Sequence, residues 1–185
     1  MRVIAGTARR TVLTAPSGTD TRPTSDRAKE GLFNIIGPLI VGARFLDLFS
    51  GSGAIGIEAL SRGASEAVFA EQAKPALEAL RKNLASVKME AAGIIIPASA
   101  LNAIGQLERE GREFDIVFMD PPYDKGLIEG TISGLLNSSV LTKDGLVIAE
   151  TETGLPLPQA DGFTLERQRD YGRTRFLFYR KGDAE

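Results

Sequence analysis

The feature that most constrains the fold is an alternation of short apolar runs with helical segments between residues 44 and 150. Each apolar run is rich in β-branched and aromatic residues and has the length of a buried strand. The runs fall at residues 44–49, 67–70, 93–96, 114–119 and 146–150, and the helical segments between them at residues 54–62, 75–87, 101–110 and 127–136. This order predicts an α/β fold with a doubly wound, mostly parallel sheet.

The carboxyl-terminal part of the chain predicts a different kind of pairing. Residues 163–170 and 174–180 are strand-like, and the short turn Tyr171-Gly172-Arg173 joins them. Two strands linked by so short a turn form an antiparallel hairpin. We therefore expect seven strands in all, with this hairpin at one edge of the sheet.

The amino-terminal part predicts a small extension ahead of the main sheet. Residues 2–5 and 11–14 are short strand-like pieces that predict a β-hairpin. A helix follows, capped by Thr24 or Ser25, and it should run to about Ile36 because Gly37-Pro38 is a stop signal. Such a helix could lie across the ligand-binding edge of the sheet.

Composition limits both the number of domains and the chemistry. With 185 residues, of which 43% are hydrophobic, the chain can build one well-cored domain. We expect a single domain over residues 1–185, with the extension at 1–40 and the main, catalytic sheet at 41–185. The chain has no cysteine and no histidine, which excludes disulfides, thiol nucleophiles and the usual base near neutral pH. Catalysis must therefore use carboxylates, Lys, Tyr, Ser, Thr or backbone groups, without a metal.

Charge and hydropathy bear on partners and location. The formal net charge is −2, so overall charge does not indicate nucleic-acid binding. No apolar run approaches transmembrane length, and the amino terminus lacks the apolar core of a signal peptide. We expect a soluble, cytoplasmic protein with no membrane contact, and a monomer by default.

Asp120-Pro121-Pro122-Tyr123 closes the strand at residues 114–119 and is the first candidate site. Proline has no N–H to donate, so the chain leaves the sheet here, at the edge where open α/β sheets bind ligands. Asp120 and the Pro121 carbonyl can accept hydrogen bonds from an amino group, and the Tyr123 ring can stack on a flat ring. The same four residues would also fit a plain turn.

The glycine turn at residues 51–56 is the second candidate site. Gly51-Ser52-Gly53-Ala54-Ile55-Gly56 fits the dinucleotide-binding pattern, and Glu71 lies at a suitable distance to hold a ribose. An NAD-dependent oxidoreductase and a turn that merely needs glycine are both open. Asp47 favours a cation, because an unpaired carboxylate at this point repels a pyrophosphate. S-adenosylmethionine carries an ammonium, a sulfonium and a ribose but no phosphate, and so it suits this turn better.

A locally basic region precedes the main sheet. Six cationic residues face only Asp20 and Asp26, namely Arg2, Arg9, Arg10, Arg22, Arg27 and Lys29. Such a run is often only a solvated surface. Arginines scattered on a hairpin also suit the phosphates of a polyanion, so an RNA-contacting arm is the alternative.

The whole chain resembles the RsmD-type small-ribosomal-subunit RNA guanine-N2 methyltransferases. The matching stretches are Arg2-Val3-Ile4-Ala5-Gly6, Arg22-Pro23-Thr24-Ser25-Asp26-Arg27, Leu32-Phe33-Asn34-Ile35, Asp47-Leu48-Phe49-Ser50-Gly51-Ser52-Gly53, Glu58-Ala59-Leu60-Ser61-Arg62-Gly63-Ala64, Asp120-Pro121-Pro122-Tyr123 and Tyr171-Gly172-Arg173-Thr174. The resemblance implies a Rossmann-like class I methyltransferase fold, S-adenosylmethionine as cofactor, S-adenosylhomocysteine as product, and small-subunit ribosomal RNA or the assembling small subunit as partner. Which guanine is modified stays open.

With this resemblance, the candidate residues fall into three groups. The catalytic group is Asp120, Pro121, Pro122 and Tyr123. The cofactor-binding group is Thr24, Asp47, Phe49, Gly51, Gly53, Glu71, Gln72, Ser99 and Ala100. The RNA-binding group is Arg2, Arg9, Arg10, Arg22, Arg27, Arg173 and Arg175. Two positions depart from the family pattern: Ala98-Ser99-Ala100 stands where an acidic or amide residue is usual, and Gln72-Ala73-Lys74 replaces a basic pair.

The expected reaction follows from the poor nucleophilicity of an exocyclic amine, whose lone pair is delocalised into the ring. Asp120 and the Pro121 carbonyl would accept its two hydrogens and aim the lone pair at the sulfonium methyl, and Tyr123 would stack on the flipped-out guanine. The methylated nitrogen would then lose a proton to Asp120 or water. Alternatives are methylation of DNA adenine or of a protein glutamine, the NAD-dependent oxidoreductase, and an RNA-binding module without activity.

Overall fold

The structure is a computed structural model, and it describes residues 1–17, 24–122 and 126–182. The helices and strands, in chain order, are α1 (Asp26–Ile40), β1 (Arg44–Leu48), α2 (Ala54–Ser61), β2 (Glu66–Ala70), α3 (Lys74–Ser86), β3 (Gly93–Ile96), α4 (Ala100–Arg109), β4 (Phe114–Met119), α5 (Leu127–Leu136), β5 (Leu141–Glu152), β6 (Phe163–Tyr171) and β7 (Thr174–Lys181). In this part of the chain, no helix has the length and apolar character needed to cross a membrane.

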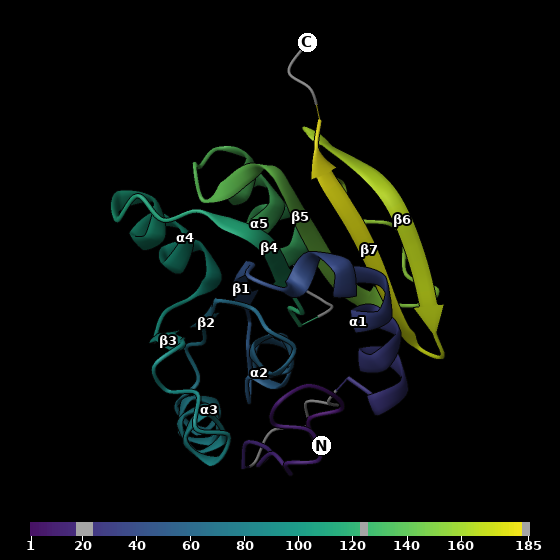
Figure 1. Cartoon of the computed structure of the whole chain (residues 1–185). Helices are drawn as coiled ribbons and strands as arrows, with labels where there is room; N and C mark the ends of the chain where they lie inside the picture. The colour runs from purple at the N-terminus through teal and green to yellow at the C-terminus, as the bar shows by residue number, and fades with distance from the viewer. Residues whose placement is uncertain (18–23, 123–125, 183–185) are drawn as a thin grey trace.

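One seven-stranded sheet organises the molecule, in the order β3-β2-β1-β4-β5-β7-β6 (Figure 1). Strands β1 to β5 run parallel, and β7 pairs antiparallel with both β5 and β6. The order of neighbours reverses between β1 and β4, which is where doubly wound sheets bind their ligands. The predicted Rossmann-like class I fold, with its antiparallel carboxyl-terminal hairpin, is confirmed.

The sheet is covered on both faces, and each strand contributes side chains alternately to the two cores. In β1, Phe45 belongs to the core that α1 and α2 cover, whereas Leu46 and Leu48 belong to the core beneath α4 and α5. Figure 1 shows α1 lying across the first of these faces. Burial on both faces explains why the central strands are continuous apolar runs in the sequence.

The predicted amino-terminal hairpin is confirmed, in a shorter form than expected. Its two segments pair antiparallel at the bridge between Arg2 and Val12, with further backbone hydrogen bonds between them. The pairing is short because the N–H groups of Ile4 and Ala5 donate to the Glu58 carboxylate at 2.7 and 2.9 Å. Those donors are then no longer available to a partner strand.

Helix α1 begins as expected and ends later than expected. Ser25 is its N-cap, with its hydroxyl oxygen accepting a hydrogen bond from the Ala28 N–H at 3.1 Å. The predicted end at Gly37-Pro38 is wrong, since the helix continues to Ile40 with Pro38 inside its last turn. Ile40 is fully buried, and this burial favours continuing the helix past a proline that removes one hydrogen bond.

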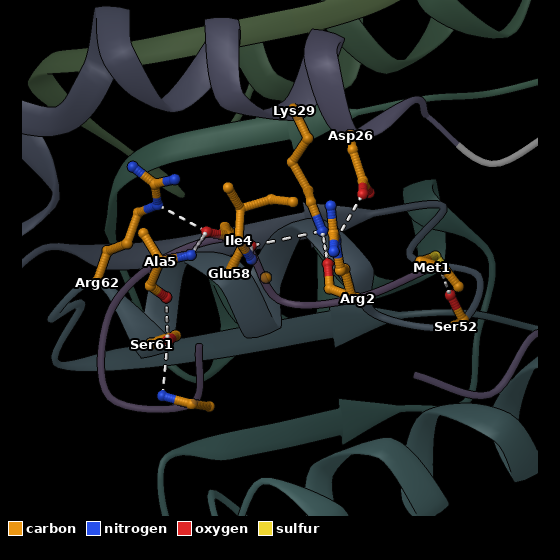
Figure 2. A network of polar contacts seen from close by, with 12 residues as sticks. Met1, Arg2, Ile4, Ala5, Asp26, Lys29, Ser52, Glu58, Ser61 and Arg62 are labelled. Atoms are coloured by element: carbon orange, nitrogen blue, oxygen red, sulfur yellow. Dashed lines mark hydrogen bonds and ion pairs between the residues drawn. The ribbon is translucent and has the colours of Figure 1, made fainter. Parts of the chain in front are cut away.

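A buried ionic cluster around Glu58 fixes the amino-terminal segment to α1 and α2 (Figure 2). Besides its two backbone donors, Glu58 in α2 pairs with Lys29 at 3.4 Å and with Arg62 at 2.8 Å. The Lys29 ammonium also donates to the Arg2 carbonyl. We call Lys29, Glu58, Arg62, Ile4 and Ala5 the Glu58 cluster. It joins α1, α2 and the amino-terminal segment into one body.

Candidate active site at the carboxyl ends of β1, β4 and β5

Three acidic side chains lie at the carboxyl ends of three adjacent strands. They are Asp47 in β1, Asp120 directly after β4, and Glu150 in β5. Register pairs Met119 with Ala149, so Asp120 and Glu150, the residues that follow them, lie at the same level, and Asp47, paired with Phe118, lies two residues earlier. Because side chains alternate along strands, all three point to the face covered by α1 and α2.

These acids line a cavity of about 1020 Å³, which we call the carboxyl cavity. The predicted site residues that line it are Thr24, Arg27, Asp47, Phe49, Gly51, Glu71, Gln72, Ser99, Ala100, Asp120, Pro121, Pro122 and Arg173. Tyr123 and Arg22 lie outside the described residues. The cavity has the size of a small-molecule site, and Tyr171 and Gly172, at the β6–β7 turn, also line it.

The structure separates five of the predicted residues from the cavity. Gly53, Arg2, Arg9, Arg10 and Arg175 do not line it. Gly53 instead has a positive φ of 80° and caps α2, and a Cβ there would lie 2.3 Å from the Leu80 side chain. Its role in the turn is explained by backbone conformation and packing.

Asp47 is as deeply buried as Glu150, with 2% of its surface exposed. No cationic side chain among the described residues pairs with Asp47, and one of its oxygens accepts a hydrogen bond from the Gly56 N–H at 3.0 Å. Burial raises the Asp47 pKa to about 8, and the nearby charge of Glu71 also raises it. The charged form of this carboxyl therefore lacks a counter-charge within the protein, and a bound cation would favour that form.

Glu71 connects the end of β2 to the glycine turn. One carboxylate oxygen accepts from the Gly51 N–H at 2.8 Å, and the other from the N–H groups of Gln72 and Ala73 at 2.8 and 2.7 Å. Phe49, just ahead of this turn, has a positive φ of 62°, which is strained for an aromatic residue. Glu71 thus stabilises the glycine turn, whose residues Phe49 and Gly51 line the cavity.

Ser99 and Thr24, two predicted cofactor ligands, have partners within the protein. The Ser99 hydroxyl oxygen caps α4 by accepting from the Asn102 N–H at 3.4 Å. The Thr24 hydroxyl, in the segment before α1, donates to the Glu150 carboxylate in β5 at 2.8 Å. Both residues line the cavity, and each also stabilises the wall that it belongs to.

Glu150 is the functional candidate that sequence reasoning missed. Only 2% of its surface is exposed, and its two oxygens accept hydrogen bonds from the hydroxyls of Thr24 and Thr174, the second at 3.4 Å. Burial raises the Glu150 pKa to about 7. The same sequence signal that identified Asp120, an acid ending a buried apolar strand, was also present at Glu150.

Asp120 is half-buried at the surface of the cavity. Its pKa is raised well above the ordinary range, first by desolvation and then by the negative charges of Glu150 and Asp47. Within residues 1–17, 24–122 and 126–182, no side chain forms an ion pair with Asp47, Asp120 or Glu150. Among the same residues, no group of three or more His, Cys, Asp or Glu side chains has the arrangement needed to hold a metal ion. The cavity therefore gathers carboxyl groups whose charged form a cationic, donor-rich ligand would stabilise.

The predicted RNA-binding arginines differ in their availability. Arg9, Arg10 and Arg27 are exposed. Arg173 is exposed and donates to Glu152 at 2.7 Å at the rim of the cavity. The Arg175 side chain is only 14% exposed and pairs with Asp170 at 3.0 Å, so it stabilises the β6–β7 hairpin.

Comparisons with known proteins agree with this geometry. The model of the family described as conserved hypothetical protein 95 matches residues 1–180. The ribosomal RNA small subunit methyltransferase D of Escherichia coli K12 is 38% identical over 183 residues, covering 98% of this chain and 90% of that protein. The protein of the same name from Haemophilus influenzae is 37% identical over 180 residues, covering 97% of this chain and 93% of that protein. A solved structure described as "Putative methyltransferase yhhF from Escherichia coli" has a TM-score of 0.86 at 36% identity, covering 98% and 97% of the two chains.

Proposed function

This chain belongs to the family described as conserved hypothetical protein 95, that of the RsmD-type ribosomal RNA methyltransferases, and we propose that it methylates the exocyclic N2 of one guanine in small-subunit ribosomal RNA. S-adenosylmethionine is the methyl donor. One observation carries the proposal: two buried acids, Asp47 and Glu150, and the half-buried Asp120 between them line one cavity directly beside Pro121.

The residues of the carboxyl cavity fit S-adenosylmethionine by their chemistry. When bound, this cofactor supplies an electrophilic methyl group on a sulfonium. Asp47 offers a buried carboxylate to the cationic amino-acid part of the ligand, and the backbone of Gly51 allows close approach, since no atom lies within 4 Å of where its Cβ would be. Glu71 has an acceptor position left for a ribose hydroxyl. A pyrophosphate would meet repulsion from the same acids.

Asp120 and the Pro121 carbonyl hold the reacting amino group. Accepting its two hydrogens favours a pyramidal nitrogen with its lone pair directed at the methyl carbon. The new N–C bond forms as the C–S bond breaks, which leaves S-adenosylhomocysteine and a cationic N-methyl amine. That nitrogen releases one proton to Asp120 or to water, so no histidine and no metal is needed. Tyr123, as the stacking partner of the guanine, stays a prediction.

Positive side chains around the cavity mouth serve the RNA. Arg27, at the start of α1, and Arg173, in the β6–β7 turn, both line the cavity and can reach phosphates on either side of a flipped-out nucleotide. We take residues 1–185 to act as one methyltransferase domain, because the Glu58 cluster fixes the amino-terminal segment to α1 and α2. The proposal places the protein in the cytoplasm, where ribosomal subunits assemble, and as a monomer.

Transfer of tritium from labelled S-adenosylmethionine to small-subunit ribosomal RNA, followed by nucleoside analysis, tests the proposal. We expect label in N2-methylguanosine. Label only in N6-methyladenosine or in protein would contradict the assigned substrate. Asp120→Ala is the matched variant, and it should abolish transfer while cofactor affinity, measured by calorimetry, stays nearly unchanged. Near-normal turnover in Asp120→Ala would refute the role of this carboxylate.

A further inference from the structure

Glu150 is a buried acid in the active site for which methyl transfer, as described, has no use. It lies on β5, one strand away from Asp120, and on the same face of the sheet. Its side chain lines the carboxyl cavity although only 2% of the residue is exposed. A carboxyl in this position is costly to keep unless it binds something.

The partners of Glu150 within the protein leave part of its hydrogen-bonding capacity open. One oxygen accepts from the Thr24 hydroxyl at 2.8 Å and the other from the Thr174 hydroxyl at 3.4 Å. Each carboxylate oxygen can accept two hydrogen bonds, so each keeps one acceptor position. Two hydroxyls from opposite walls therefore orient the carboxylate without satisfying it.

Guanine presents two kinds of donor side by side on its Watson–Crick edge, the N1–H and the N2 amino group. Adjacent parallel strands lie about 4.8 Å apart, so acids at the same level of β4 and β5 can contact neighbouring groups of one base. Asp120 and the Pro121 carbonyl hold N2 in the proposed reaction. An N1–H on the side of β5 would meet Glu150 as its acceptor.

We propose that Glu150 accepts the guanine N1–H and thereby selects guanine over adenine and other bases that lack this hydrogen. The inference rests on the proposed function and adds the residue that determines base specificity. Adenine turns a lone pair at N1 toward the carboxylate, which leaves two acceptors facing each other in a buried site. A site built to bind an N–H discriminates strongly against the analogue without it.

The experiment uses 2-aminopurine, which keeps the exocyclic N2 amine but carries no hydrogen on N1. The methylated guanine is first located in small-subunit ribosomal RNA by nucleoside mapping. That RNA is then rebuilt by ligation with guanosine or 2-aminopurine at the mapped position, and presented both naked and in reconstituted subunits. We expect the wild-type protein to prefer guanosine by on the order of 100-fold in kcat/KM. Equal methylation of both bases by the wild-type protein would overturn the inference, whatever the variants do.

Glu150→Gln gives the residue-specific test. The amide keeps one acceptor oxygen and adds a donor that suits the bare N1 of 2-aminopurine. We expect the preference for guanosine to fall to about tenfold or less, through loss on guanosine and gain on 2-aminopurine. Glu152→Gln, the same change two residues along β5, should leave the ratio at its wild-type value.

The outcomes separate the two proposals. If Glu150→Gln lowers kcat/KM equally for both bases, Glu150 only supports the cavity wall and the inference is wrong. If the wild-type protein yields no N2-methylguanosine from any small-subunit RNA, the proposed function itself fails. N2-methylguanosine from the wild type with an unchanged base ratio in Glu150→Gln refutes the specificity role alone.

Discussion

Two glutamates of this protein are equally buried and have opposite surroundings. Glu58, in the Glu58 cluster, is fully buried and receives two backbone N–H groups and two cations, from Lys29 and Arg62. Glu150, in the carboxyl cavity, is 2% exposed and receives only two hydroxyl groups. Burial raises the Glu150 pKa to about 7.

The difference shows how the surroundings of a buried acid distinguish a structural role from a ligand-binding role. At Glu58 the chain supplies the counter-charges, and the result is a joint between three segments (Figure 2). At Glu150, and at its neighbours Asp47 and Asp120, the structure collects carboxyls without an ion-pair partner among the described residues and leaves a cavity beside them. Buried acids without cations are costly, so such a group indicates a binding site for a cationic or donor-rich ligand.

The same substitution at the two glutamates gives the largest expected contrast. Glu58→Gln leaves Lys29 and Arg62 without a buried counter-charge and sets an amide donor against backbone N–H groups. We expect it to reduce the free energy of unfolding by about 3–5 kcal/mol. Glu150→Gln removes an acid that burial already disfavours, and we expect a change within about 1 kcal/mol, of either sign.

Urea unfolding at neutral pH measures both variants against the wild type. The slope of the unfolding free energy with urea provides the control, since an altered slope would point to a change in the unfolded state. Equal destabilisation by the two substitutions would contradict the distinction between a structural and a ligand-binding acid. Substantial stabilisation by Glu150→Gln would strengthen it.

The next effect is the pH dependence of stability in the ligand-free protein. The Asp47 pKa is raised from its ordinary value of 3.8 to about 8, so between these values the folded state binds a proton that the unfolded state lacks. Stability contributed by this group therefore falls as pH rises through the range, by up to about 1.4 kcal/mol per pH unit, and levels off above it. Asp47→Asn should flatten this fall. The two proteins should converge in stability toward acid pH and differ most near pH 8.

S-adenosylmethionine provides the matching ligand experiment. A cation beside Asp47 lowers its pKa, so binding near neutral pH should release protons, and affinity should increase with pH up to about 8. Calorimetry in buffers of different ionisation enthalpy counts the released protons. Asp47→Asn should release fewer. If proton release is the same in both proteins, Asp47 does not compensate the ligand's charge.

Much of the fold follows from the sequence because its determinants are local. The period of the apolar runs and the length of each segment predicted seven strands and their pairing type, and the bounds of β3 and α5 match those expected. The shortness of the amino-terminal hairpin could not be predicted, because Glu58, more than fifty residues away in the sequence, accepts hydrogen bonds from the N–H groups of Ile4 and Ala5. A contact so distant in sequence leaves no local signal.

The site residues likewise divide into those that a local sequence signal predicts and those whose role depends on strand register. Asp47, Glu71 and Asp120 were predicted because each follows or ends a strand, and all three line one cavity. Glu150 has the same signal, and its role depends on the register of β4 and β5, which the sequence does not give. Arg175 was assigned to RNA by charge alone, whereas the register of β6 and β7 pairs it with Asp170.

A smaller effect concerns Arg9 and Arg10, which lie exposed in the segment that the Glu58 cluster holds. If this segment also contacts RNA, the double variant Arg9→Ala/Arg10→Ala should bind small-subunit RNA more weakly. The slope of log affinity against log salt should become shallower by about one to two. Thermal unfolding is the control, since exposed side chains should affect stability little. An unchanged salt slope would mean that the two arginines are only solvated.

The smallest expected effect is that of Arg2→Ala. This variant tests whether an ion pair must be buried to contribute strongly to the stability of the amino-terminal segment. Arg2 pairs with Asp26 at 2.9 Å, beside the Glu58 cluster, but the two side chains are 61% and 43% exposed. Water already compensates both charges, so removing one should change the free energy of unfolding by less than about 1 kcal/mol. The Lys29 ammonium bonds to the backbone carbonyl of Arg2, and this contact survives the substitution. Chemical unfolding of Arg2→Ala beside Glu58→Gln measures both effects. A loss at Arg2 as large as that at Glu58 would mean that ion pairing itself, and not burial, holds the segment in place.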